Sequence, residues 1–129
     1  MKWFIKVMKN YANFTGRARR TEYWVFYLFT TTLGVFTILL DYLCGTSFGD
    51  SYTGWITILV GIPFYIPGFA VFVRRLHDIG KSGFFFFLGF IPIVGPIILF
   101  VMLCTEGQVG ENQYGPDPKQ EEEQQADTM

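Results

Sequence analysis

Residues 23–40 read Y-W-V-F-Y-L-F-T-T-T-L-G-V-F-T-I-L-L, a run of eighteen residues without a charged side chain. A helix that crosses the hydrocarbon core of a bilayer needs about 20 predominantly apolar residues. Arg17, Arg19 and Arg20 stand just before this run, and basic residues at the entry of a first apolar segment orient a chain in a membrane. The stretch therefore predicts a first transmembrane helix, at 23–43.

The composition of the 129-residue chain supports this interpretation. Aromatic residues make up 19 % of it, with fifteen phenylalanines, whereas charged residues make up 16 %, and the mean hydropathy is +0.30. Such a chain has too few polar side chains to cover a soluble core. No cleavable signal peptide is expected, because the first apolar run is too long for one and no small-residue cleavage site follows it.

The segment 1–22 is basic and precedes the first apolar run. When residues 2–14 are wound as a helix, the lysines and asparagines fall within an arc of about 100°, and aromatic and aliphatic side chains fill the remaining face. This pattern predicts an amphipathic helix. Two placements remain open for it: in the plane of the membrane interface, or packed on the protein's own membrane helices with the lysines facing water.

Two further uncharged runs follow. The run at 55–73 predicts a second transmembrane helix, kinked at Pro63 and Pro67. The run at 84–104 is long enough to be a third, although F-I-P-I-V-G-P at its centre also suits a re-entrant hairpin. The expected fold is an all-α membrane protein: an N-terminal amphipathic interfacial helix followed by three transmembrane helices, the last two proline-kinked.

The segments between these runs differ in charge. Six of the ten basic residues lie in 1–22, three in the loop 74–83, one in the tail 105–129 and none in the loop 44–54. Cytoplasmic segments of membrane proteins carry the excess of Lys and Arg. With three spans, this count places the N-terminus and the 74–83 loop in the cytoplasm and the 44–54 loop and C-terminus in the periplasm. The tail is turn-rich at first and then acidic and polar, which predicts disorder.

Three separated motifs share a pattern with a known family. They are F-T-G-R-A-R-R-T-E-Y-W at 14–24, R-R-L-H-D-I-G-K-S-G at 74–83 and G-E-N-Q-Y-G-P-D-P at 110–118. In this combination and order they closely resemble the bacterial inner-membrane family called domain of unknown function 805, over residues 3–118. Phe84 stands where that family usually has a tryptophan. The resemblance implies a small multi-pass protein of the bacterial inner membrane, and implies no activity, substrate or cofactor.

The chemically capable side chains gather in the first two motifs. A histidine beside an aspartate can serve as a general base, with arginines to hold a phosphate. The chain has one histidine, however, and neither a Walker-type phosphate loop nor a nucleophile elbow. Anchoring of the helices at the interface is the simplest role for these residues. The alternative role is contact with an anionic lipid headgroup or a partner protein, made by Arg17, Arg19, Arg20, Glu22, Arg74, Arg75, His77 and Asp78.

We accordingly expect a non-enzymatic protein that binds lipid or a partner through a basic cytoplasmic face. It should need no catalytic residue, metal, cofactor or nucleic acid, and its partners should be membrane lipids, anionic ones included, another membrane protein or a second copy of this chain. A subunit of a small oligomeric transporter or channel is the second hypothesis, although no ionisable residue lies within the apolar runs. A lipid-headgroup enzyme is the third. Cys44 and Cys104 would both lie at periplasmic helix ends, where a disulfide between them can form, although two unrelated thiols at helix ends are the more common case.

Overall fold

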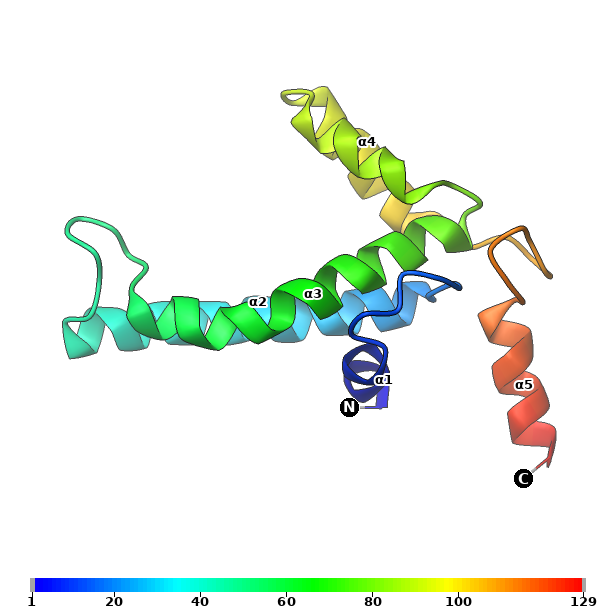
Figure 1. The fold of residues 1–129 in the computed structure, drawn as a ribbon, viewed down its shortest axis with the longest axis horizontal. Helices are drawn as coiled ribbons and strands as arrows, with labels where there is room; N and C mark the ends of the chain where they lie inside the picture. Colours follow the sequence, from blue (N-terminus) through cyan, green and yellow to red (C-terminus); the bar gives the residue numbers. More distant parts are fainter. Residues whose placement is uncertain (1, 129) are drawn as a thin grey trace.

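The structure, a computed structural model, describes residues 2–128, and these form helices joined by loops, without a β-strand (Figure 1). The two longest helices lie antiparallel and form the body of the molecule; the first helix crosses them on one side, and a short helical hairpin diverges from the end of the second long helix. In chain order the elements are α1 (Lys2–Lys9), α2 (Arg20–Cys44), α3 (Trp55–Asp78), the 3-10 helix η1 (Gly83–Phe90), α4 (Val94–Cys104) and α5 (Pro118–Thr128).

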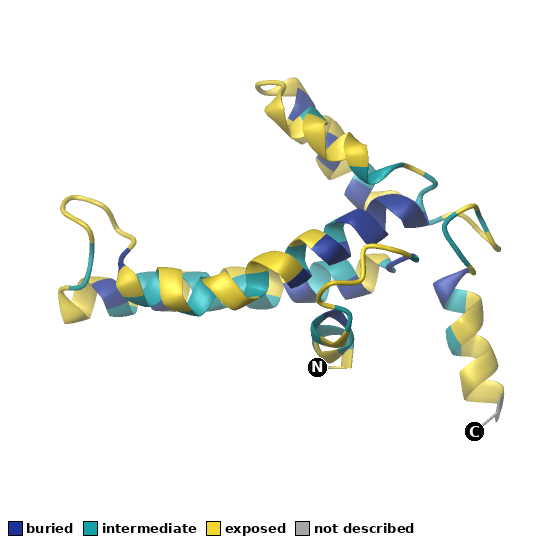
Figure 2. Cartoon of the chain, viewed as in Figure 1, coloured by how far each residue is buried: buried dark blue, intermediate teal, exposed yellow. Residues whose placement is uncertain are grey.

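The helices α2 and α3 have the length and composition of membrane-spanning helices. At 25 and 24 residues they are each about 36 Å long, which exceeds the roughly 30 Å of a hydrocarbon core. Only 11 % and 22 % of the residues in their most apolar stretches are buried, and Figure 2 shows exposed residues along both helices. Large hydrophobic side chains such as Leu28, Phe36 and Leu59 are among the exposed ones. A core helix of a soluble protein would be mostly buried. The helix α3 runs unbroken through Pro63 and Pro67, and the kink expected there stays a prediction.

The prediction of a third transmembrane helix at 84–104 is wrong. The chain there reverses at residues 91–93, between η1 and α4. Ile93 takes a φ of 68°, a value that β-branched residues rarely adopt, and the following turn requires Gly95, since a Cβ there would lie 1.6 Å from the carbonyl oxygen of Leu88. The eleven residues of α4 rise about 16 Å, half the thickness of a hydrocarbon core. The segment is the hairpin that the sequence left open as an alternative.

The hairpin returns the chain to the end of the molecule from which it left. Arg20, at the start of α2, donates a hydrogen bond to the carbonyl oxygen of Cys104 (3.1 Å), and Arg75, near the end of α3, donates to that of Leu103 (3.1 Å). The tail therefore begins beside the N-terminal segment, whereas the sequence predicted the two at opposite ends of the membrane helices; the side of the membrane that each terminus faces stays a prediction. We call this end, where α2 begins and α3 ends, the basic end.

The apolar face of α1 packs on the protein's own helices, which is one of the two placements left open by the sequence. Val7 is fully buried in a cluster with Phe26 and Val71, and the Phe4 ring lies 5.7 Å from that of Phe26. The helix ends at Lys9, sooner than the 2–14 pattern predicts. Burial of this face ties α1 to α2 and α3 at the basic end.

At the opposite end, Asp41 holds the turn between α2 and α3. This carboxylate is fully buried and has no cationic partner. It accepts five hydrogen bonds of 2.5 to 3.0 Å, from Thr46 Oγ1, Gly54 N, Ile56 N, Thr57 N and Thr57 Oγ1. Three of these donors are first-turn N–H groups that a helix cannot satisfy itself, so Asp41 acts as the cap of α3 from another helix. Sequence reasoning assigned Asp41 no role beyond ending the first apolar run.

The acidic end of the tail is helical, contrary to the prediction of disorder. Pro118, with its fixed φ, suits the first turn of α5, and Asp117 caps the helix by accepting a hydrogen bond from the N–H of Lys119 (3.0 Å). Glu and Gln, which favour helices, supply most of the remainder. The pair Asp117-Pro118 indicates the start of this helix, but the polar composition of the whole tail favoured the prediction of disorder.

Candidate functional site

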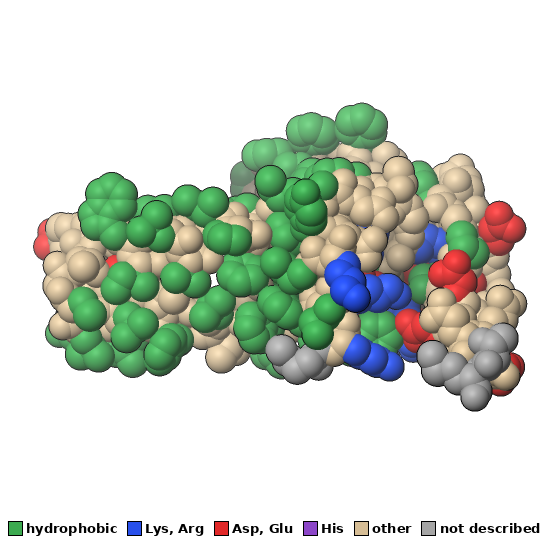
Figure 3. All heavy atoms as spheres, turned by 60° about the horizontal axis from the view of Figure 1, so that its bottom comes forward, with side chains coloured by type: hydrophobic (Ala, Val, Ile, Leu, Met, Phe, Trp, Pro, Cys, Tyr) green, Lys and Arg blue, Asp and Glu red, His purple; other side chains and the backbone are tan. Residues whose placement is uncertain are grey.

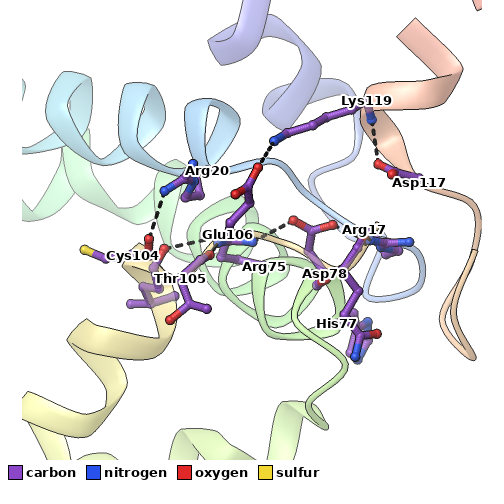
Figure 4. Close-up of polar contacts among 12 residues, drawn as sticks. Arg17, Arg20, Arg75, His77, Asp78, Cys104, Thr105, Glu106, Asp117 and Lys119 are labelled. Atoms are coloured by element: carbon purple, nitrogen blue, oxygen red, sulfur yellow. Dashed lines mark hydrogen bonds and ion pairs between the residues drawn. The ribbon is translucent and has the colours of Figure 1, made fainter. Parts of the chain in front are cut away.

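The three sequence motifs meet at the basic end. Blue and red side chains gather there in Figure 3, while the body made by α2 and α3 is almost entirely apolar. The 14–24 motif joins α1 to α2, the 74–83 motif ends α3, and the 110–118 motif folds back on both. Residues more than 100 positions apart in sequence make ion pairs with one another here. Figure 4 shows part of this cluster.

Arg17 joins all three motifs. Its Nε donates to Asp78 Oδ1 at 3.0 Å, its Nη1 donates to the carbonyl oxygen of Gly110 at 2.5 Å, and its Nη2 donates to that of Gln108. The side chain is buried, and this planar fork of donors is what a guanidinium offers and an ammonium does not. Arg17 therefore fixes the tail loop to α3 and has no donor left for a lipid headgroup.

Arg75 and Asp78 complete the same buried network. Arg75 Nη1 donates to Asp78 Oδ2 at 2.7 Å, and Nη2 donates to the carbonyl oxygen of Thr105 (Figure 4). Asp78 thus lies between two guanidinium groups, and its backbone carbonyl accepts from the N–H of Gln108 at 2.8 Å. Gly107 fits against it, because a Cβ there would lie 2.0 Å from Asp78 Oδ2. Both charged residues serve the fold and face no solvent.

His77 is also held by internal contacts. Its Nδ1 lies 3.0 Å from the carbonyl oxygen of Gly16, and its ring stacks on that of Tyr114 with centroids 4.1 Å apart. The Asn112 side chain donates to the His77 carbonyl at 3.0 Å. The ring therefore joins the 110–118 loop to α3. Asp78 faces the two arginines, so the His–Asp pairing that would suit a general base is not present.

A second polar cluster lies between α1, α2 and α5. Arg74 donates to Glu22 Oε1 at 2.7 Å, and Lys6 lies 3.8 Å from both Glu22 Oε2 and Glu122 Oε1. Arg19 forms an ion pair with the other oxygen of Glu122. These five residues form one continuous chain of ion pairs, which we call the Glu122 cradle. Sequence reasoning named three of them and missed Lys6 and Glu122, since neither belongs to a motif.

The cradle keeps spare hydrogen-bond donors. The side chain of Arg74 is 4 % exposed, yet its Nε and Nη2 have no partner, and the buried Nε of Arg19 also has none. Glu22 is fully buried, and its Oε2 accepts no hydrogen bond. Of the eight residues that the sequence proposes for headgroup or partner contact, Arg20 alone is exposed.

The tail loop is held by two carboxylates. Burial acts to raise the pKa of Asp117, but hydrogen bonds from the N–H groups of Gly110 (2.9 Å) and Lys119 (3.0 Å) hold it below the usual carboxyl value. A hydrogen bond from Lys119 Nζ lowers the pKa of Glu106. Both groups favour the charged form, so neither is a candidate acid catalyst at neutral pH.

A groove of about 590 Å³ runs along α2, α3 and the hairpin at the level of the apolar segments. Aromatic rings, small residues and threonines line it, Tyr65, Gly61 and Thr37 among them, and no charged side chain does. Ion-coupled transport needs an ionisable group within the membrane. The groove therefore does not favour the transporter hypothesis.

The two cysteines lie at opposite ends of the molecule. Cys44 ends α2, whereas Cys104 lies beside Arg20, the first residue of α2, which is about 36 Å away along that helix. Both thiols are free and exposed. A disulfide requires Cα atoms within about 7 Å. The pairing that the sequence left possible is therefore not formed in this structure, because the third apolar segment turns back at residues 91–93.

The chain resembles curated proteins over nearly its whole length. It is 45 % identical over 125 residues to the inner membrane protein YhaH of Escherichia coli (strain K12), covering 94 % of this chain and 99 % of that protein. It is 39 % identical over 119 residues to the inner membrane protein YhaI of the same strain, covering 92 % and 97 %. No solved structure matches. With its two long apolar helices, the chain is a bacterial inner-membrane protein.

The particular family follows from a second comparison. The model described as "Protein of unknown function (DUF805)" matches residues 11–116, so the chain belongs to that family. This confirms the resemblance recognised from the three motifs. The family description and the names of the two relatives state a location and no activity.

Proposed function

We propose that this protein is a non-enzymatic membrane protein that binds anionic lipids at its basic end, with both termini in the cytoplasm. The proposed sidedness rests on charge. With two spans and a re-entrant hairpin, all ten basic residues belong to the basic end, and none lies in the loop at 45–54. The positive-inside rule assigns such an end to the cytoplasm. The difference is ten basic residues against none, compared with nine against one for an arrangement with three spans.

The observation that carries the proposal is that the basic residues fall into a buried set and an exposed set. Arg17, Arg74 and Arg75 are buried and bound internally. A separate set of exposed cations surrounds the entry of the membrane helices: Lys2, Lys9, Arg20 and Lys81. Cations at this position each contribute about 1 kcal/mol to association with an anionic leaflet. The headgroup contact is thereby assigned to this exposed set, in which Arg20 is the one residue that the sequence also proposed.

A role without catalysis fits the same geometry. The sole histidine is stacked and bound, and the described residues contain no group of three His, Cys, Asp or Glu side chains that could hold a metal ion. Asp78, which lines a hollow of about 270 Å³, is bound by Arg17 and Arg75, so binding is the function that the site supports best.

The test is native mass spectrometry of the full chain extracted with its own lipids. We expect the wild type to retain anionic phospholipid, and the triple variant Lys2→Gln, Lys9→Gln and Lys81→Gln to retain at least about tenfold less, since three cations are lost. Lys119→Gln is the control, because its ammonium is on α5 and already paired with Glu106. Equal retention by the wild type and the triple variant would contradict the proposal.

A further inference from the structure

The acidic helix α5 is attached to the rest of the protein by charge. Its Glu122 carboxylate lies between Lys6 and Arg19, and its start is fixed by Asp117 and Lys119. Hollows of about 330 and 270 Å³ flank it, one against α1 and one against the loop at 106–109. Apolar side chains do not anchor α5, because Ala126 is its only aliphatic residue after Pro118. Ion pairs that solvent reaches stabilise a fold only slightly, so α5 is held weakly.

The surroundings of Glu122 suit an anion more strongly charged than a carboxylate. The cradle contains three cations and two carboxylates, and without Glu122 it holds three cations against Glu22 alone. Arg74 and Arg19 keep unpaired buried N–H groups in it. The Trp3 ring supports the cations: Lys6 Nζ lies 5.7 Å and Arg19 Cζ 5.2 Å from its centroid.

We propose that the Glu122 cradle is a binding site for a phosphate group, formed by Lys6 and Arg19 and backed by Arg74, and that Glu122 of α5 occupies it as a competing anion. The Glu122 carboxylate marks the place of the phosphate oxygens, because it already bridges the two cations that would bind them. A phosphate carries one or two negative charges and more acceptor oxygens than a carboxylate, and guanidinium groups bind it well. Anion binding therefore displaces α5 from the basic end.

This inference deepens the proposed function and rests on it, in that it names one discrete site where the exposed cations give only diffuse attraction. A phospholipid headgroup and a free phosphate share the chemistry that the cradle recognises. The position of α1 beside the membrane helices places Lys6 and Trp3 where a headgroup can reach them. The experiment below separates the two sources.

The matched variants are Glu122→Gln and Glu121→Gln. Both remove one negative charge from α5, but Glu122 is paired with Lys6 and Arg19, while Glu121 is exposed and forms no salt bridge with any residue in the described part of the chain. The full chain in zwitterionic nanodiscs is titrated with phosphatidylglycerol, followed by native mass spectrometry. We expect Glu122→Gln to raise the affinity about three- to fivefold, because it removes the competing carboxylate that pairs with Lys6 and Arg19, and Glu121→Gln to leave the affinity unchanged.

Two further arms define the ligand and the displacement. Inorganic phosphate is titrated against the same proteins without phosphatidylglycerol, with thermal stability as the readout. Tighter binding of the lipid alone by Glu122→Gln indicates a headgroup, and tighter binding of inorganic phosphate indicates a free anion; either supports the site. Amide hydrogen exchange in 118–128 should rise when the ligand binds, and adding Lys6→Gln to Glu122→Gln should cancel the gain in affinity.

The outcome that overturns the inference is the same affinity for both ligands in Glu122→Gln and Glu121→Gln. Equal rises in both variants would show bulk attraction without a discrete site and would leave the proposed lipid binding intact. If the wild type and the lysine triple variant retain the same amount of anionic lipid, the proposed function is overturned instead. The titration with inorganic phosphate would still test the Glu122 cradle in that case. The two failures are therefore distinguishable.

Discussion

At the scale of single residues, the role of an arginine depends on whether its side chain is buried or exposed. Arg17 and Arg75 are buried, and all of their nitrogen atoms donate hydrogen bonds within the chain, whereas Arg20 is exposed and donates to one carbonyl oxygen. The sequence places all three in basic motifs and cannot separate them, because exposure depends on how the hairpin and tail fold back. The role of Asp41 also depends on tertiary structure, because it caps α3 only where the loop brings the start of α3 back to it.

Arg17→Lys tests this difference at the residue scale. The ammonium cannot reach Asp78 and two carbonyl oxygens in one plane, so buried acceptors lose their donors at a cost of about 2 kcal/mol or more. We expect thermal unfolding in detergent at a clearly lower temperature, with earlier proteolysis of the tail at 105–117. Arg20→Lys is the matched control and should unfold like the wild type. Equal stability of the two variants would contradict the assigned role of Arg17.

At the scale of elements, local patterns predicted most of the helices. The apolar runs predicted α2 and α3, and the lysine arc predicted α1 except for its length. The sequence could not decide between a span and a hairpin at 84–104, because a span and a re-entrant pair of short helices have the same composition and the same number of residues. The turn at residues 91–93 and the tight approach at Gly95 decide between them. For α5, the Asp-Pro start signal outweighs the disorder that the acidic composition of the tail predicts.

Gly95→Ala tests the hairpin turn. A methyl group there would lie 1.6 Å from the carbonyl oxygen of Leu88, so the turn must open, at a cost of about 1 to 3 kcal/mol. Gly89→Ala is the control in the same hairpin, because its nearest neighbour is the flexible end of Leu99 at 3.4 Å. We expect thermal stability in detergent to fall for Gly95→Ala and to change little for Gly89→Ala. The reverse order would exclude the turn described here.

At the scale of the whole molecule, the hairpin decides at which end of the molecule the tail lies. It returns the chain to the basic end, where the 110–118 motif meets the 14–24 and 74–83 motifs and the buried network around Arg17 and Asp78 forms. A third span would have separated the first two motifs from the third by the thickness of the membrane. The convergence of the motifs is thus a consequence of topology.

Reporter fusions test this arrangement in cells. A reporter that is active only in the periplasm, and its cytoplasmic counterpart, are each fused after residue 50 and after residue 129. We expect periplasmic activity after residue 50 and cytoplasmic activity after residue 129, since the basic end carries every Lys and Arg. Cytoplasmic activity after residue 50 and periplasmic activity after residue 129 would show that the orientation is inverted, and would leave the fold unchanged. Periplasmic activity at both would show that the segment 84–104 crosses after all.

The sequence by itself determined the membrane location, the all-helical class, the two long spans and the family, because hydrophobicity and helix periodicity are local properties that survive without tertiary context. Only the tertiary structure decided that 84–104 turns back as a hairpin, which arginines are buried, and that Glu122 lies between Lys6 and Arg19. Those questions concern contacts between residues far apart in the chain, and such contacts cannot be read from local hydrophobicity or helix periodicity.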